Sequence, residues 1–143
     1  MEYPEAFYHS YHSQKPICGV LAVAIAAGVT YDVASEACKQ AMKDIYPNRQ
    51  RFGGKTTTPQ RELAMKRLGV KFERTNFETK KPKFIDVVRD FEPGVMYHVV
   101  TPKHIQTVLD GFVIDQGKRE RVEAWHSANK RVREVTKIVG KGW

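Results

Sequence analysis

The chain has 143 residues, 41% of them hydrophobic and 28% charged, which is enough apolar sequence for one soluble domain and excludes wholesale disorder. Its 24 Lys and Arg against 16 Asp and Glu give a formal net charge of +8, but the cations are scattered, so a solvated basic surface is favoured over a dedicated nucleic-acid site. Two cysteines are too few for a disulfide framework, and no apolar run is long enough to span a bilayer.

The first half of the chain is predicted to be mainly helical. Residues 1–15 show no periodicity and are expected to form an irregular arm. Residues 18–27 should form a helix that is buried all round, because apolar side chains cover every face, and Gly28 ends it. A second helix is expected over residues 31–45, where Thr30 can cap the first turn.

A third helix is predicted after a polar loop at residues 46–58. Thr58 fits an N-cap and Pro59 fits the first helical position. The helix should run to Leu68, where Gly69 closes it.

The second half of the chain is predicted to consist mainly of strands. Asp110-Gly111 is a strong two-residue turn signal, so residues 104–109 and 112–115 should form a hairpin. Further strands are expected at residues 70–77, 95–101 and 131–139, with a helix at 83–91. The predicted fold class is therefore α+β, with N-terminal helices packed on a C-terminal antiparallel sheet in a single domain of residues 1–143.

Cys18 lies at the start of the predicted buried helix. The thiolate is the reactive form of cysteine, and a helix N-terminus stabilises negative charge. Gly19 follows and leaves room for a substrate carbonyl to approach. Cys18 and Cys38 also fit the simpler interpretation of small buried apolar side chains, so Cys18 by itself does not identify a nucleophile.

The predicted hairpin brings a histidine close to a carboxylate. Pairing around Asp110-Gly111 sets Gln106 opposite Asp115, and His104 shares a strand face with Gln106. Asp115 is then diagonal to His104, about 7–8 Å away at the backbone and within reach of a side-chain contact. A general base needs such an acceptor to orient its imidazole. A surface histidine and a strand-end aspartate are the alternative interpretation.

The segments around Cys18 and His104 resemble papain-like and C39-like cysteine peptidases. Residues 18–26, Cys-Gly-Val-Leu-Ala-Val-Ala-Ile-Ala, are similar to the nucleophile helix of these enzymes, and residues 104–115 to their histidine strand with the strand after it. The order of a cysteine helix, a Gly-Gly-x-Thr loop and a histidine hairpin also resembles small papain-like proteins of tailed bacteriophages. The resemblance implies a papain-like fold, a Cys–His–Asp/Asn site, and amide-bond hydrolysis without a cofactor.

Matched residue by residue, the resemblance makes Cys18 the nucleophile, His104 the base and Asp115 the orienting acid. Gln14 matches the upstream glutamine that helps to form an oxyanion hole, although it stands only four residues before Cys18. A solvent-facing residue in the arm is an equal alternative for Gln14, and the backbone N–H of Cys18 is the other expected donor. Asn129 is an alternative for the orienting role.

Other motifs are predicted to carry no chemistry. Gly53-Gly54-Lys55-Thr56 is similar to the end of a phosphate-binding loop, but Arg49 stands where that motif needs glycine, so a flexible loop near the cleft is expected instead. His9 and His12 have no second pair of ligands, so no metal site is expected. His98 is expected to pack in the core.

The sequence therefore favours a thiol hydrolase that acts on a peptide or protein substrate through Cys18, His104 and Asp115. Two alternatives stay open: a catalytically silent protein of the same fold that binds and inhibits a host factor, and a basic nucleic-acid-binding protein. The acidic first residues lack a signal-peptide pattern, and the resemblance to phage proteins implies the host cytoplasm, or association with the virion. No membrane partner is expected.

Overall fold

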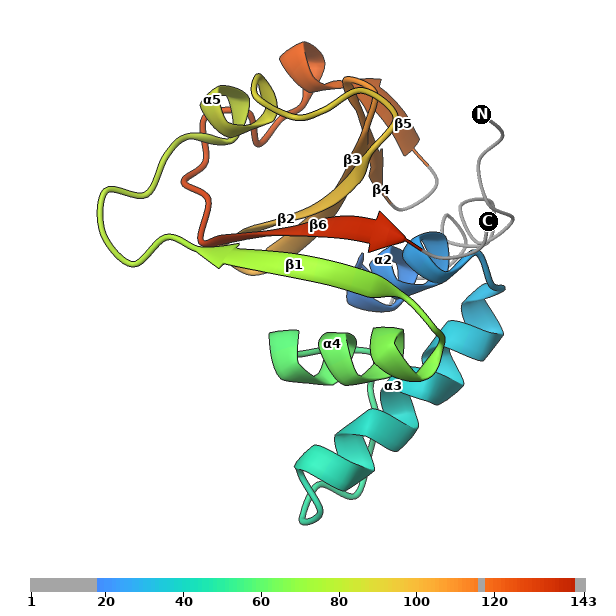
Figure 1. The fold of residues 1–143 in the computed structure, drawn as a ribbon. Helices are drawn as coiled ribbons and strands as arrows, with labels where there is room; N and C mark the ends of the chain where they lie inside the picture. The colour runs from blue at the N-terminus through green and yellow to red at the C-terminus, as the bar shows by residue number, and fades with distance from the viewer. Residues whose placement is uncertain (1–17, 116–117, 141–143) are drawn as a thin grey trace.

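The computed structural model of the protein describes residues 18–115 and 118–140 (Figure 1). The arm expected at residues 1–15 lies outside the described residues, and so do Gln14, His9 and His12 within it. Statements about the structure below concern the described residues.

Three helices open the described chain: α2 (Cys18–Ala27), α3 (Tyr31–Ile45) and α4 (Thr58–Arg67). The bounds of α2 and α3 confirm the prediction from the sequence. Every residue of α2 from Gly19 to Ala27 is buried. A helix without a polar face has to be enclosed by other elements, and α2 is therefore the centre of the helical layer.

The helix caps agree with the sequence at α3 and differ from it at α4. The Thr30 side chain accepts a hydrogen bond from the Val33 N–H at 3.3 Å, as expected. The prediction that Thr58 caps α4 is wrong, because the cap is Thr57. The Thr57 hydroxyl accepts from the Gln60 N–H, and the Gln60 side chain accepts from the Thr57 N–H, both at 3.3 Å. This reciprocal pair satisfies two backbone donors at once, which a cap at Thr58 would not do.

The strands form one antiparallel sheet in the order β1-β6-β2-β3-β4-β5. The strands are β1 (Lys71–Asn76), β2 (Met96–Thr101), β3 (His104–Leu109), β4 (Phe112–Asp115), β5 (Lys118–Arg121) and β6 (Glu134–Gly140). A sheet of this kind with helices packed on it confirms the predicted α+β class.

Strand β5 was not predicted from the sequence. Its residues are Lys-Arg-Glu-Arg, all of them charged, so they lack the alternation of polar and apolar residues that signals a strand. It pairs with β4 and forms one edge of the sheet. Charged residues on an edge strand discourage pairing with other chains, which explains the composition.

Two expected elements are shorter in the structure. The strand expected from residue 131 begins at Glu134, because Arg131 bridges to Lys83 and the Val132 N–H donates to the Pro82 carbonyl. The helix expected over 83–91 is α5 (Phe84–Val88). Beyond Val88 the chain turns and Phe91 stacks on Tyr97 of β2, with ring centroids 3.7 Å apart and planes inclined by 4°.

Both faces of the sheet are covered. Figure 1 shows α2, α3 and α4 on one side and α5 on the other. On the helical side, the core of α2 is joined by sheet residues Met96, Leu109, Ile114 and Ile138. On the opposite side, Phe84 and Trp125 pack with sheet residues Tyr97, Val99, Val108, Val113 and Val135. Because neighbouring residues of β2 and β3 face different cores, nearly every residue of these strands is buried, including the polar ones.

His98 of β2 is a buried polar residue on the α2 side of the sheet. It is 2% exposed, has a backbone hydrogen bond with Ala22, and its Nε2 has no hydrogen-bond partner among the described residues. Burial, assisted by the positive charge of Arg61, lowers the pKa of His98 to about 3. The imidazole is therefore held neutral in the folded protein, as expected for a core histidine.

We expect His98 to make the protein sensitive to mild acid. The unfolded chain binds a proton at His98 below its ordinary pKa of 6.5, whereas the folded chain does so only near pH 3, so stability is lost as pH falls between these values. The free energy of unfolding, measured by urea titration, should fall by roughly 1.5 kcal/mol between pH 6.5 and 5. His98→Leu should flatten this dependence; an unchanged slope would contradict the assignment.

Candidate active site

The β3–β4 hairpin sets the position of the histidine and the carboxylate. Its register pairs Thr107 with Ile114 and Leu109 with Phe112, as the turn at Asp110-Gly111 predicted. Asp110 and Gly111 both have positive φ, 50° and 79°, which is the conformation of the tight turn that joins twisted strands.

The contact expected between His104 and Asp115 is present. His104 Nε2 lies 2.6 Å from Asp115 Oδ2, across the open end of the hairpin. The Asp115 side chain is 7% exposed and that of His104 is 24% exposed, so the carboxylate is buried behind a partly accessible ring. An acceptor in this place fixes the orientation of the imidazole and stabilises its protonated form.

Cys18 meets the other side of the same imidazole. Its thiol is hydrogen-bonded to the His104 side chain and to the backbone of Ile105, the next residue of β3. Because Nε2 faces Asp115, Nδ1 is the ring nitrogen left for the thiol. The structure thus brings together three of the four residues that the sequence singled out, and the fourth, Gln14, lies outside the described residues.

The two cysteines have opposite acidities. Burial raises the pKa of the Cys18 thiol, but the hydrogen bonds from His104 and Ile105 and the charge of His104 outweigh it, so the net pKa is below the ordinary value of 9.0. Hydrogen bonds with Asp115 and Cys18 raise the pKa of His104 to about 10. Burial raises the pKa of Cys38 to about 12. Cys18 and His104 therefore favour a thiolate–imidazolium pair, while Cys38 stays a packed thiol.

The loop before α4 lies directly against the start of α2. A Cβ atom added at Gly19 would stand 1.8 Å from Thr56 Oγ1, so only glycine allows this approach. Arg61 of α4 fixes the loop: its Nη1 donates to the Thr56 carbonyl at 3.2 Å and to Thr56 Oγ1 at 3.0 Å, and its Nη2 to Thr58 Oγ1 at 2.8 Å. The loop lies at the cleft, as the sequence suggested, and Arg61 anchors its C-terminal end on α4.

Arg61 is a site residue that sequence reasoning missed. It is 6% exposed, and its Nη2 lies 3.7 Å from Glu134 Oε1 of β6. Burial lowers its pKa, while the charges of Glu134 and Cys18 act in the opposite direction. The helix α4 is largely polar and has no clear apolar stripe, so its sequence carries no local signal that Arg61 will be buried.

Cys18 and His104 line an open cleft of about 620 Å³, and Asp115 contacts His104 without lining the cleft itself. Its lining also includes Gly19, Ile105 and the segment from Gly54 to Thr58, which leads into α4. Neither Asn129, the alternative that the sequence offered for the orienting role, nor the nearby Trp125 lines the cleft. Asn129 is exposed, and Trp125 packs in the core on the far face of the sheet, where its Nε1 donates to Gln106 Oε1 at 3.2 Å.

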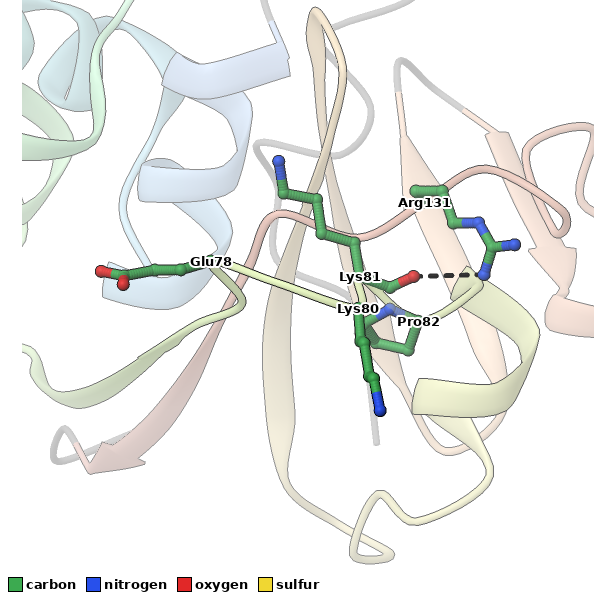
Figure 2. A pocket seen from close by; sticks show the side chains of 5 residues that line it. All are labelled: Glu78, Lys80, Lys81, Pro82 and Arg131. Atoms are coloured by element: carbon green, nitrogen blue, oxygen red, sulfur yellow. Dashed lines mark hydrogen bonds between the residues drawn. The ribbon is translucent and has the colours of Figure 1, made fainter.

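A second hollow carries no comparable chemistry (Figure 2). It is lined by Glu78, Lys80, Lys81, Pro82 and Arg131. Figure 2 shows the two lysine ammonium groups on opposite sides, and the Arg131 guanidinium is turned back to donate to the Lys81 carbonyl at 3.1 Å. The cations do not converge on one point, and the hollow contains no nucleophile.

The described residues contain no group of three or more His, Cys, Asp or Glu side chains arranged to hold a metal ion. Within residues 18–115 and 118–140, no single helix is long and apolar enough to cross a membrane; by length and composition only, α2 and α3 pass together, as a pair bent by 112°.

In the comparisons with known proteins, no family model matches the chain, and no curated protein or solved structure is significantly similar to it.

We expect Cys18 to be the more reactive cysteine by about 100-fold or more towards iodoacetamide at pH 7, since it has both the lower pKa and the greater exposure. Mass spectrometry of the alkylated peptides gives the two rates. The sharper comparison is the pH profile of Cys18 itself, which should move to higher pH in His104→Ala because the imidazolium that lowers the thiol pKa is gone. Equal rates for both cysteines, or an unmoved profile, would show that Cys18 is not activated.

Gly19→Ala should destabilise the protein by about 1–3 kcal/mol, because the new methyl group overlaps Thr56 Oγ1 and forces the loop away from α2. Urea unfolding measures the loss. In a Thr56→Ala background the same substitution should cost less, since the clashing hydroxyl is absent. Equal costs in the two backgrounds would mean that Gly19 and Thr56 do not touch.

Proposed function

We propose that the protein is a papain-like thiol hydrolase that cleaves an amide bond in a peptide or protein. The proposal is carried by one observation: Cys18, His104 and Asp115 form a continuous chain of contacts at an open cleft. A nucleophile, a base beside it and an acceptor behind the base are the three parts that covalent acyl transfer requires.

The chemistry follows from the charges of the pair. The Cys18 thiolate attacks the substrate carbonyl carbon, and the carbonyl oxygen becomes an oxyanion. As the intermediate collapses, the C–N bond breaks, the leaving nitrogen takes the His104 proton, and a thioester with Cys18 remains. Neutral His104 then takes a proton from water, whose oxygen attacks the thioester, and the C–S bond breaks to release the acid and restore the thiolate–imidazolium pair.

Asp115 supports this cycle by holding the ring. With Nε2 bound to a buried carboxylate, the imidazole keeps Nδ1 towards Cys18 through both protonation states. The oxyanion needs separate donors. The start of α2 supplies backbone N–H groups without helical partners, and the N–H of Cys18 is the proposed one.

We expect Cys18→Ala and His104→Ala to abolish hydrolysis of a peptide library followed by mass spectrometry. Asp115→Asn should lower kcat by about 100-fold or more, because an amide orients the ring without stabilising its charge. The same substitution should lower the pKa of His104. The falling limb of the pH–rate profile, which lies near pH 10 in the wild type, should therefore shift to lower pH. Cys38→Ala, which changes a buried thiol that does not line the cleft, is the matched control and should keep full activity.

Loss of activity in Cys38→Ala but not in Cys18→Ala would contradict the proposal. If the protein has a cellular effect that Cys18→Ala retains in full, the same fold acts by binding a host factor instead. Retention of nucleic acid at low salt, lost steeply as salt is raised, would favour the basic nucleic-acid-binding alternative.

A further inference from the structure

We propose that the cleft recognises an acidic peptide, with Asp or Glu side chains close to the bond that is cut. The proposal rests on the hydrolase function proposed for the same cleft and names the class of its substrate.

The cleft is lined by cations and by no carboxylate of the described residues. The four cations are Lys55, Arg61, Lys103 and Arg133. Arg61 is buried and forms an ion pair with Glu134. The other three are exposed, and the structure gives none of them an ion pair with a described carboxylate. Elsewhere on the surface several cations are paired, for example Arg67 with Asp44 at 2.5 Å.

The three exposed cations come from different segments that meet only in the folded protein. Lys55 follows Gly54 in the loop that touches Gly19. Lys103 lies in the turn between β2 and β3, directly before His104. Arg133 precedes β6, and its backbone is fixed at both ends: its N–H donates to the Val100 carbonyl at 2.7 Å, and its carbonyl accepts from the Phe77 N–H at 2.9 Å.

The backbone of Lys103 is a second, independent observation. Its φ is 63°, in the left-handed region where a side chain is disfavoured and glycine is not. The two-residue turn from Thr101 to His104 would be better served by glycine at this position. A lysine held there at a conformational cost, beside the candidate base, is typical of a residue kept for its side chain.

Charge complementarity then selects the substrate. A concave, low-dielectric wall concentrates the field of the cations inside the cleft, where it attracts anions and repels basic peptides. The neighbouring hydroxyl groups of Thr56 and Thr58 accept hydrogen bonds from Arg61. The preference of the cleft for an anionic peptide therefore rests on Lys55, Lys103 and Arg133. An extended peptide with carboxylates on either side of the bond offers partners to all three.

The first test measures binding without turnover. Fluorescently labelled peptides rich in Glu are compared with Gln-for-Glu peptides of the same length on the inactive Cys18→Ala protein, by anisotropy at low salt. We expect the acidic peptides to bind about 10-fold more tightly or better, and the difference to shrink as salt rises. Equal binding of both peptides, or tighter binding of a single-stranded oligonucleotide than of any peptide, would overturn the proposal.

The second test measures the field at Cys18 and does not require hydrolysis. The ratio of the alkylation rates by iodoacetate, an anion, and iodoacetamide, its neutral analogue, is compared between wild type and Lys55→Gln/Lys103→Gln/Arg133→Gln. We expect this ratio to fall roughly fivefold in the triple variant at low salt. The matched control is Lys43→Gln/Lys81→Gln/Lys130→Gln, which removes the same charge from exposed positions outside the cleft and should leave the ratio unchanged. Equal falls in both variants would overturn the proposal.

Lys103→Gly separates recognition from folding. Glycine suits the positive φ, so the melting temperature should stay the same or rise. The iodoacetate preference and the preference for acidic peptides should both weaken. If neither changes while stability rises, Lys103 has no part in recognition. Because these readouts use binding and alkylation, the substrate class can fail while hydrolysis stands, and hydrolysis can fail while the substrate class stands.

Discussion

The burial of α2 on every side is the constraint on which the rest of the structure depends. A helix whose residues from Gly19 to Ala27 are all buried has no face to offer to water, so the sheet must cover one side and α3 with α4 the other. Its first residue, Cys18, is partly exposed and lies next to the start of β3. Packing of apolar side chains thus determines where the thiol lies, and hydrogen bonding only then determines its chemistry.

The acidity of the thiol follows from that position. Cys18 and Cys38 are both close to the core, and burial alone would raise the pKa of either. Among the described residues, Cys18 has an imidazole beside it and Cys38 does not, and that imidazole is itself held by the buried Asp115. One chain of contacts therefore lowers the pKa of the Cys18 thiol, whereas burial without such a partner raises the pKa of Cys38.

The part of the cleft that the loop before α4 forms depends on a buried charge. Arg61 joins the loop at Thr56 to Glu134 of β6, and this brings the loop down onto Gly19. A buried ion pair contributes little net stability, but it fixes one arrangement of the segments it joins. The loop held in this arrangement carries Lys55 into the lining of the cleft, which Lys103 also lines, so the network that shapes the cleft also contributes to its charge.

Local sequence determined much of the fold and most of the site. The Asp110-Gly111 turn fixed the hairpin register and hence the contact of His104 with Asp115, and apolar residues on every face of residues 18–27 fixed the burial of α2. Tertiary structure alone decided the anchoring of the loop by Arg61, the cap at Thr57, the charged strand β5 and the place of Arg133 at the cleft. Hydrophobic periodicity and turn residues act over a few positions, so the elements they specify can be predicted from the sequence. The contacts of Arg61 and Arg133 join segments far apart in sequence and exist only once the core has brought those segments together.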